Sequence, residues 1–250
     1  MRSGHLSLRT KLGLSFLAVI ILGSLSWLVF GSRLIRNTII AQAQDKVRHD
    51  LNSARMVFDE KLRAVESVVR LTASREGIRN AVATGKNDIL SRYLGRVRIE
   101  NGLDILNLLD SRGRVLVRTR TPSVTGDDMS GDTLVRRAVE RKTVAAPQIK
   151  SPEALARESP EMAERALIEF IPTPMAAPRE GNRETSGMAL EAASPVIGED
   201  GTVLGVLTGG ILLNRNYEIV DRVKEIVFKD ERYKGRETGT ATIFQGDLRI

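Results

Sequence analysis

The hydrophobic pattern of the chain opens with an uncharged apolar run, residues 12–32, that follows a basic head, residues 1–11. At a rise of about 1.5 Å per residue, a helix over this run spans roughly 30 Å, the thickness of the hydrocarbon core of a bilayer. The run therefore predicts a transmembrane helix. Because positive residues precede it, the positive-inside rule places the head in the cytoplasm and everything after residue 32 outside.

A removable secretory signal is the alternative interpretation of this run. Signal sequences are shorter and end near small residues. Here the apolar run continues through Trp27 and Phe30, and the A-x-A candidate at 41–43 lies beyond Arg33 and Arg36. This arrangement favours an uncleaved anchor.

Residues 33–76 contain neither glycine nor proline, and their apolar positions recur at steps of four and three. This spacing predicts one long stalk helix with a continuous apolar stripe. The stripe packs either on the helix's own domain or on a second copy of the chain, and the sequence leaves both open. The second option predicts a homodimer. The stripe consists of Ala43, Val47, Leu51, Ala54, Phe58, Leu62, Val65 and Val69.

After residue 76 the pattern becomes a mixture of short helices and β-rich runs. Two pairs of β-rich runs flank glycine-containing turns, which predicts two hairpins and an α+β domain with an antiparallel sheet. The predicted helices cover 78–83, 88–98, 133–142 and 217–228, and the predicted strands cover 103–110, 114–119, 166–171, 189–197 and 202–213, with a further strand, turn and start of a strand over 239–250.

Composition narrows the function classes. The net charge is +7, but 31 acidic residues are interspersed with the basic ones, so the surface is mixed and gives little support to nucleic-acid binding. The absence of cysteine excludes disulfides and thiolate metal sites. The two histidines, His5 and His49, fall on opposite sides of the predicted membrane span. We therefore predict no metal site and no cofactor.

Three motifs stand in an order that resembles the Cache sensor domains of bacterial receptors, which are PAS-like extracellular modules. They are D-S-R-G at 110–113, P-x-x-x-G-D at 122–127 and the run S-P-V-I-G-E-D-G-T-V-L-G-V-L-T-G-G-I at 194–211. The resemblance implies a first Cache module over 77–215. It also implies that residues 216–250 are a connecting helix and the truncated start of a second module, so that residue 250 ends a fragment.

The resemblance implies a ligand-sensing domain in a bacterial plasma-membrane receptor, most often a histidine kinase. A chemotaxis transducer, or a single-span envelope protein with a structural role, is the alternative. No catalytic domain is predicted in these residues. His49 starts a sequence like a phosphoacceptor box but lies outside the membrane in this topology, so we expect it on a solvated face of the stalk. The glycines of 205–210 lack the lysine of a phosphate loop and are expected in a strand packed closely on its neighbour.

The candidate ligand residues are Arg118, Arg120 and Glu191. The two arginines are expected on one face of the strand leaving the first hairpin, where they can bind a carboxylate bidentately. Glu191, expected on the strand opposite, can hold a ligand amine or pair with an arginine. The predicted ligand is therefore a small carboxylate or an amino acid. A solvated strand edge is the alternative interpretation of the arginines. Asp127 and Asp128 are predicted to cap a helix, and a cation site is the alternative interpretation of this pair.

The stretch 151–187 is rich in proline, with Pro152, Pro160, Pro172, Pro174 and Pro178. Apart from the strand starting at Ala166, it is expected to be a long loop. A mobile surface excursion is the preferred interpretation, and a lid over a pocket is the alternative.

Overall fold

The computed structural model describes residues 7–171, 181–228, 232–233, 236–237 and 239–250. The chain divides into two compact units, residues 1–53 and 54–250. The first unit consists of the N-terminal part of one helix. The second holds a sheet and the remaining helices.

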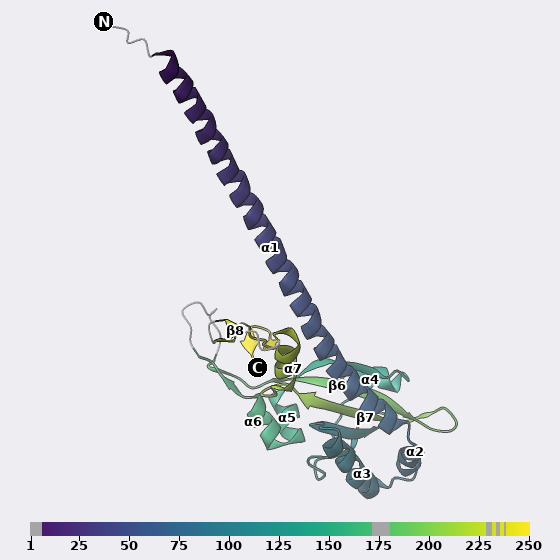
Figure 1. Ribbon diagram of the computed structural model, residues 1–250. Helices are drawn as coiled ribbons and strands as arrows, with labels where there is room; N and C mark the ends of the chain where they lie inside the picture. Colours follow the sequence, from purple (N-terminus) through teal and green to yellow (C-terminus); the bar gives the residue numbers. More distant parts are fainter. Residues whose placement is uncertain (1–6, 172–180, 229–231, 234–235, 238) are drawn as a thin grey trace. The chain divides into compact units, whose positions relative to one another are not determined.

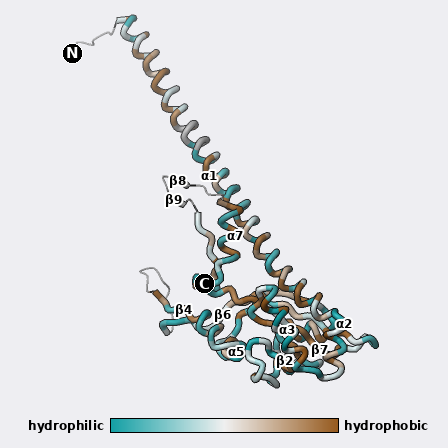
Figure 2. Tube along the Cα trace, turned by 60° about the horizontal axis from the view of Figure 1, so that its bottom comes forward, coloured by the Kyte–Doolittle hydropathy of each residue, from teal (hydrophilic) through white to brown (hydrophobic). Residues whose placement is uncertain are grey.

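The first element is helix α1, Leu8–Ala73 (Figure 1). Its segment Leu8–Leu28 is apolar enough and long enough to cross a membrane, a test that a signal sequence also passes. Figure 2 shows the hydrophobic positions along this part of the helix. The continuous stalk helix expected over 33–76 is confirmed, except that it ends at Ala73. His49 is exposed on it, as expected.

The second unit is built on a five-stranded antiparallel sheet in the order β2-β1-β7-β6-β3. This confirms the predicted α+β class and both hairpins, whose turns place Gly113 and Gly201 at positive φ. Strand β3 was not expected from the sequence. It contains Pro147 and lies at the sheet edge, where a missing N–H donor is tolerated. The strands are β1 (Ile105–Asp110), β2 (Val115–Arg118), β3 (Val144–Lys150), β6 (Gly187–Ile197) and β7 (Val203–Leu212).

The glycines of β7 sit where neighbouring strands approach closely. A Cβ atom on Gly205 would lie 2.4 Å from the carbonyl oxygen of Leu109, and one on Gly210 would lie 2.7 Å from that of Leu190. This confirms the prediction of a packed strand rather than a phosphate loop.

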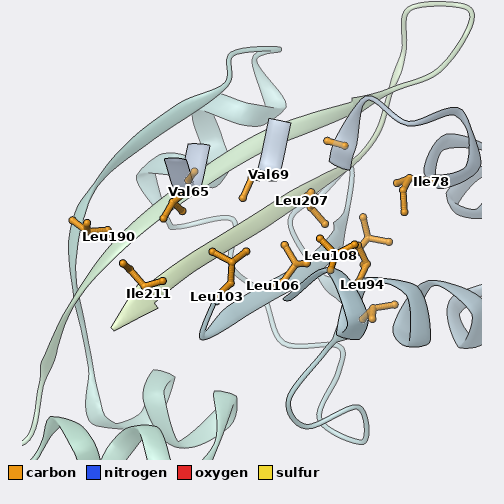
Figure 3. Close-up of a cluster of buried hydrophobic side chains, with 14 of the residues drawn as sticks. Val65, Val69, Ile78, Leu94, Leu103, Leu106, Leu108, Leu190, Leu207 and Ile211 are labelled. Carbon is orange, nitrogen blue, oxygen red and sulfur yellow. The ribbon is translucent and has the colours of Figure 1, made fainter. Parts of the chain in front are cut away.

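One face of the sheet is covered by the C-terminal part of α1 together with α2 (Glu76–Ala83) and α3 (Asn87–Glu100). Figure 3 shows this core, in which Val65 and Val69 of α1 meet leucines and an isoleucine of the sheet. The labelled sheet residues are Leu106, Leu108, Leu190, Leu207 and Ile211.

The apolar stripe of α1 has two different environments. Val65 and Val69 are buried against the sheet, and Phe58 and Leu62 pack on the same cluster. By contrast, Val47 is 66% exposed, and Leu51 is likewise exposed. The C-terminal part of the stripe therefore packs on its own domain, while the N-terminal part, which includes Val47 and Leu51, carries exposed apolar side chains.

The opposite face of the sheet is covered by three short helices, α4 (Thr133–Val139), α5 (Pro152–Glu158) and α6 (Pro160–Ala166). Helix α4 packs on one apolar cluster, which includes Leu109 and Val206. Helices α5 and α6 pack on another, which includes Ile105 and Leu212.

The expectation of a long loop over 151–187 is wrong for α5 and α6. Pro152 and Pro160 each take the first helical position, where a missing N–H has no cost. Ser151 and Ser159 cap the two helices through their hydroxyl oxygens. The strand expected over 166–171 is only β4 (Ile168–Glu169), paired with β5 (Arg183–Glu184). Pro172, Pro174 and Pro178 lie outside the described residues.

The C-terminal part begins with α7 (Glu218–Val227), which confirms the predicted helix. Ile219 and Val223 of α7 join the core under α1, and Lys61 of α1 forms a 2.6 Å ion pair with Glu218. Short hairpins follow, β8 (Arg232–Tyr233) with β9 (Arg236–Glu237), and β10 (Phe244–Gln245) with β11 (Leu248–Arg249). The last of these is the strand, turn and strand expected over 239–250.

Candidate ligand site

A row of buried polar side chains crosses the sheet on the face of α4, α5 and α6, between the two apolar clusters. Strand alternation and register place its members on this face: Asn107 lies opposite both Arg118 and Thr208. Buried polar groups are costly unless they are paired, so such a row needs a reason. The row consists of Arg118 on β2, Asn107 on β1, Thr208 on β7, Glu191 on β6 and Lys150 on β3, all of them largely buried.

Arg118 is held between two carboxylates and is 2% exposed. Its Nε donates to Glu158 Oε1 at 3.0 Å, and its two terminal nitrogens donate to the two oxygens of Asp127 at 3.0 Å each. One of these nitrogens also donates to the carbonyl of Val124 at 2.7 Å. Burial alone would raise the pKa of Asp127, but the hydrogen bonds and charge of Arg118 outweigh it and hold that pKa below its usual value.

Lys150 and Glu191 form a second buried pair, with 2.9 Å between Nζ and Oε2. Asp132 lies 3.8 Å from the same ammonium while its side chain caps α4. Burial lowers the pKa of Lys150, but Glu191 and Asp132 outweigh it, and the pKa rises. Burial, with the nearby charges of Asp132 and Glu158, raises the pKa of Glu191 despite the ammonium. The groups around this pair therefore carry a net negative charge.

Glu158, at the end of α5, connects the row to the helical cover. Its Oε1 accepts from Arg118 and also from Asn107 Nδ2, at 2.7 Å. Its Oε2 and Asn107 Oδ1 are both buried and have no hydrogen-bond partner among the described residues. Asn107 and Glu158 line a cavity of about 10 Å³, which is lined also by Ile105, Met129, Asp132, Leu134, Val135, Lys150, Glu191, Ala192 and Thr208.

Arg120 lies beyond the end of β2 and belongs to a different cluster, centred on Asp104. Its Nη2 donates to Asp104 Oδ1 at 3.1 Å, and Arg165 donates to the same oxygen at 2.8 Å. Its Nη1 reaches Glu161 at 3.3 Å. Burial and the charge of Arg120 together lower the pKa of nearby Arg98.

With this geometry in view, comparison with known proteins identifies the family. Residues 40–227 match the dCache_3 family, described as the double sensory domain of two-component sensor kinases. The chain belongs to this family. No curated protein gives a significant match.

Several solved sensor domains resemble the dCache_3 chain. The sensor domain of the Vibrio cholerae histidine kinase DctB has a TM-score of 0.50 at 13% identity, covering 72% of this chain and 58% of that one. The periplasmic domain of Vibrio cholerae LuxQ has a TM-score of 0.45 at 18% identity, covering 71% and 69%. The E. coli DcuS sensor domain has a TM-score of 0.43 at 17% identity, covering 68% and 96%. At these identities the likeness concerns the fold alone.

Several expectations about the site need correction. Glu191 does not lie on the strand opposite the arginines, because β1 and β7 stand between β2 and β6. It pairs with Lys150 instead of an arginine. The solvated-edge interpretation is wrong for Arg118, which is buried. Asp127 and Asp128 do not cap α4: Asp127 binds Arg118, and the Asp128 side chain accepts from the backbone of Ser130. The cap is Asp132.

Four residues of the candidate site were not identified from the sequence: Asn107, Thr208, Lys150 and Glu158. Asn107 is a polar residue within the apolar alternation of β1, and this was a usable signal. Lys150 ends a strand that the sequence did not reveal, and Glu158 ends a helix in a stretch that was interpreted as a loop. Lys150 and Glu158 could not be assigned to the site from the sequence, because the strand and the helix that position them were not predicted.

Proposed function

We propose that the chain is the extracytoplasmic ligand-sensing part of a two-component sensor kinase, anchored in the plasma membrane by the N-terminal part of α1. Membership of the dCache_3 family and the apolar segment Leu8–Leu28 support this proposal. The family description favours a histidine kinase output over a chemotaxis transducer.

The observation that carries the sensing role is the buried polar row under α5 and α6. Replacing a buried ion pair by packed apolar residues is often neutral or stabilising, so stability alone gives no reason for one. Here Arg118 with Glu158, and Lys150 with Glu191, cross the middle of an otherwise apolar face. This arrangement favours a ligand site over the alternative of a purely structural envelope domain.

The proposed domain organisation follows the sequence: a cytoplasmic head at 1–11, a membrane span at 12–32, a stalk at 33–76, a first module at 77–215 and the start of a second module at 216–250. The stalk completes the module's core through Val65 and Val69. A small ligand that binds one packing of the sheet on α1 better than another shifts the population of the two, which is the thermodynamic requirement for a signal.

We also propose that the chain is a homodimer. The exposed positions Val47 and Leu51 continue the apolar stripe of α1 beyond the part that packs on the domain. Symmetric dimers are the commonest oligomers, and a shared stalk would couple the two domains.

The topology is tested by fusing an exported phosphatase, or a cytoplasmic fluorescent reporter, after Gly77 and after Gly201. If the phosphatase fusions are active and the fluorescent fusions show no fluorescence at both sites, the extracytoplasmic assignment is supported. Inactive phosphatase fusions together with bright fluorescent fusions contradict it.

Sensing is tested with the full chain in detergent micelles and a library of amines, carboxylates, amino acids and sugars. A compound that raises the melting temperature of the native chain but not of Lys150→Met supports the site. If no compound in the library raises it, the sensing role at this face is contradicted.

A further inference from the structure

The small cavity in the polar row offers hydrogen-bond acceptors that lack donors. Asn107 and Glu158 both line it, and the atoms Asn107 Oδ1 and Glu158 Oε2 are buried and have no partner among the described residues. The orientation of the Asn107 amide is fixed, because its Nδ2 must face the carboxylate oxygen of Glu158 at 2.7 Å. The atom left facing away is therefore an acceptor. A buried acceptor without a donor is costly, so both atoms favour an occupant that donates hydrogen bonds.

The charges around the cavity favour a positive occupant. Its lining carries the carboxylates of Asp132, Glu158 and Glu191 against the single ammonium of Lys150. With all four charged, the lining has a net charge of −2, and the nearby Arg118 does not offset it because its guanidinium, which binds Glu158, is also bound by the carboxylate of Asp127. The raised pKa of Glu191 reflects burial and this crowding of negative charge. The ammonium of Lys150 is already engaged by Glu191 at 2.9 Å.

A carboxylate ligand meets the opposite situation. Arg118 Nε donates to Glu158 and its terminal nitrogens donate to Asp127 and Val124, so only one of its five N–H groups lacks a hydrogen-bond partner among the described residues. A ligand carboxylate would have to displace one of these two internal carboxylates. It would also bring a negative charge to a lining that is already negative.

We propose that this cavity binds a primary ammonium group, which donates to Asn107 Oδ1 and Glu158 Oε2, so that the sensed ligand is a small amine. The inference rests on the proposed function, and it narrows the ligand of that site. A cavity of about 10 Å³ has room for one water-sized group, which fits an ammonium head but not a quaternary one. The carbon part of any amine, methylammonium included, exceeds this volume and has to displace part of the α5 and α6 cover, which links ligand binding to a movement of these helices.

The test uses the full chain in detergent micelles at neutral pH and constant ionic strength. Its melting temperature is measured in methylammonium chloride, tetramethylammonium chloride, sodium acetate and sodium chloride. We expect a saturable rise with methylammonium relative to sodium chloride, because this cation alone among the four salts is both small and a hydrogen-bond donor. Tetramethylammonium and acetate should match sodium chloride.

Glu158→Gln and Glu161→Gln form a matched pair of variants. Each removes one carboxylate that binds an arginine, but only Glu158 borders the cavity, and Glu161 is 79% exposed. Glutamine at 158 removes the charge and places an N–H donor where a free acceptor stood. The methylammonium effect should disappear in Glu158→Gln and persist in Glu161→Gln. If Glu158→Gln does not fold, the comparison of methylammonium with tetramethylammonium on the native chain still decides.

The outcomes separate this inference from the proposed function. If methylammonium raises the melting temperature no more than sodium chloride does, or no more than tetramethylammonium does, the ammonium site is refuted. A water molecule then suffices to fill the cavity. Retention of the effect in Glu158→Gln also refutes it. A rise with acetate alone overturns the amine assignment but keeps the row as a sensing site. Failure of the proposed function is shown separately, when no class of compound in the library raises the melting temperature.

Discussion

Replacing Arg118 by alanine removes the central charge of the polar row and leaves its partners in place. Glu158, which is 5% exposed, then keeps only the hydrogen bond from Asn107 and loses its charged partner. Asp127 loses both of its hydrogen bonds from the guanidinium, but its side chain is 19% exposed and partly reaches water. The dominant effect is therefore a buried carboxylate without a countercharge at Glu158.

The size of the effect follows from this geometry. Removing one partner of a buried ion pair costs about 3–5 kcal/mol, because the remaining charge stays desolvated. The Asp127 pair adds less, since water screens partly exposed pairs. Against a total stability of about 5–15 kcal/mol for a typical domain, Arg118→Ala should lower the free energy of unfolding by a large fraction.

The assay is urea unfolding of the full chain in detergent, followed by far-ultraviolet circular dichroism. Two comparisons isolate the buried charge. The double variant Arg118→Met with Glu158→Leu removes both charges and should recover much of the loss. Arg137→Ala, which breaks an exposed pair with Glu140, should change the stability by less than about 1 kcal/mol. A loss below about 1 kcal/mol for Arg118→Ala would refute the buried pair and restore the solvated strand edge.

The remaining predictions concern the stalk, acid stability and the glycines. Val69→Asp should unfold or strongly destabilise the second unit, because it buries a charge in the core shown in Figure 3. Val47→Asp lies at an exposed position, so it should leave the urea midpoint of the second unit unchanged and should weaken only the self-association of the chain, as measured by crosslinking. Because the pKa of Asp127 is lowered in the folded state, its contribution to stability is present above its unfolded pKa of 3.8 and is lost as the pH falls below about 4. Asp127→Asn should therefore flatten the acid side of a plot of stability against pH, and an unchanged slope would contradict the pairing. Gly205→Ala should lower the free energy of unfolding by about 1–3 kcal/mol or more, because the added Cβ meets a main-chain oxygen of β1. Gly95→Ala, where the added Cβ enters open space on α3, should raise the free energy of unfolding by roughly 0.5–1 kcal/mol. Equal effects of the two glycine changes in urea titrations would argue against the close strand pairing.

The sequence predicted those parts of the fold that local patterns specify. Alternation around Gly113 and Gly201 revealed both hairpins, and the absence of glycine and proline revealed the stalk. It did not reveal β3, because Pro147 interrupts a run without clear alternation. Helices α5 and α6 were predicted as loops, because a proline at the first helical position resembles a helix breaker unless the preceding serine is interpreted as the N-cap of the helix.

The candidate site was predictable only in part, because its contacts join distant segments. Arg118 and Glu191 were singled out, but their partners Glu158 and Lys150 are each about forty positions away in sequence. No local pattern indicates such a pairing. The strand order also had to be known before Glu191 could be placed next to β3 rather than β2.

The central claim is that the face of the sheet under α4, α5 and α6 is the sensing site. Hydrogen exchange of the full chain, with and without a compound that raises its melting temperature, tests this most directly. The account predicts slower exchange in peptides covering β1, β6 and α5, with little change in peptides confined to α2 and α3. Protection confined to α2 and α3, where a separate apolar cavity of about 250 Å³ lies beside Tyr93, would contradict it.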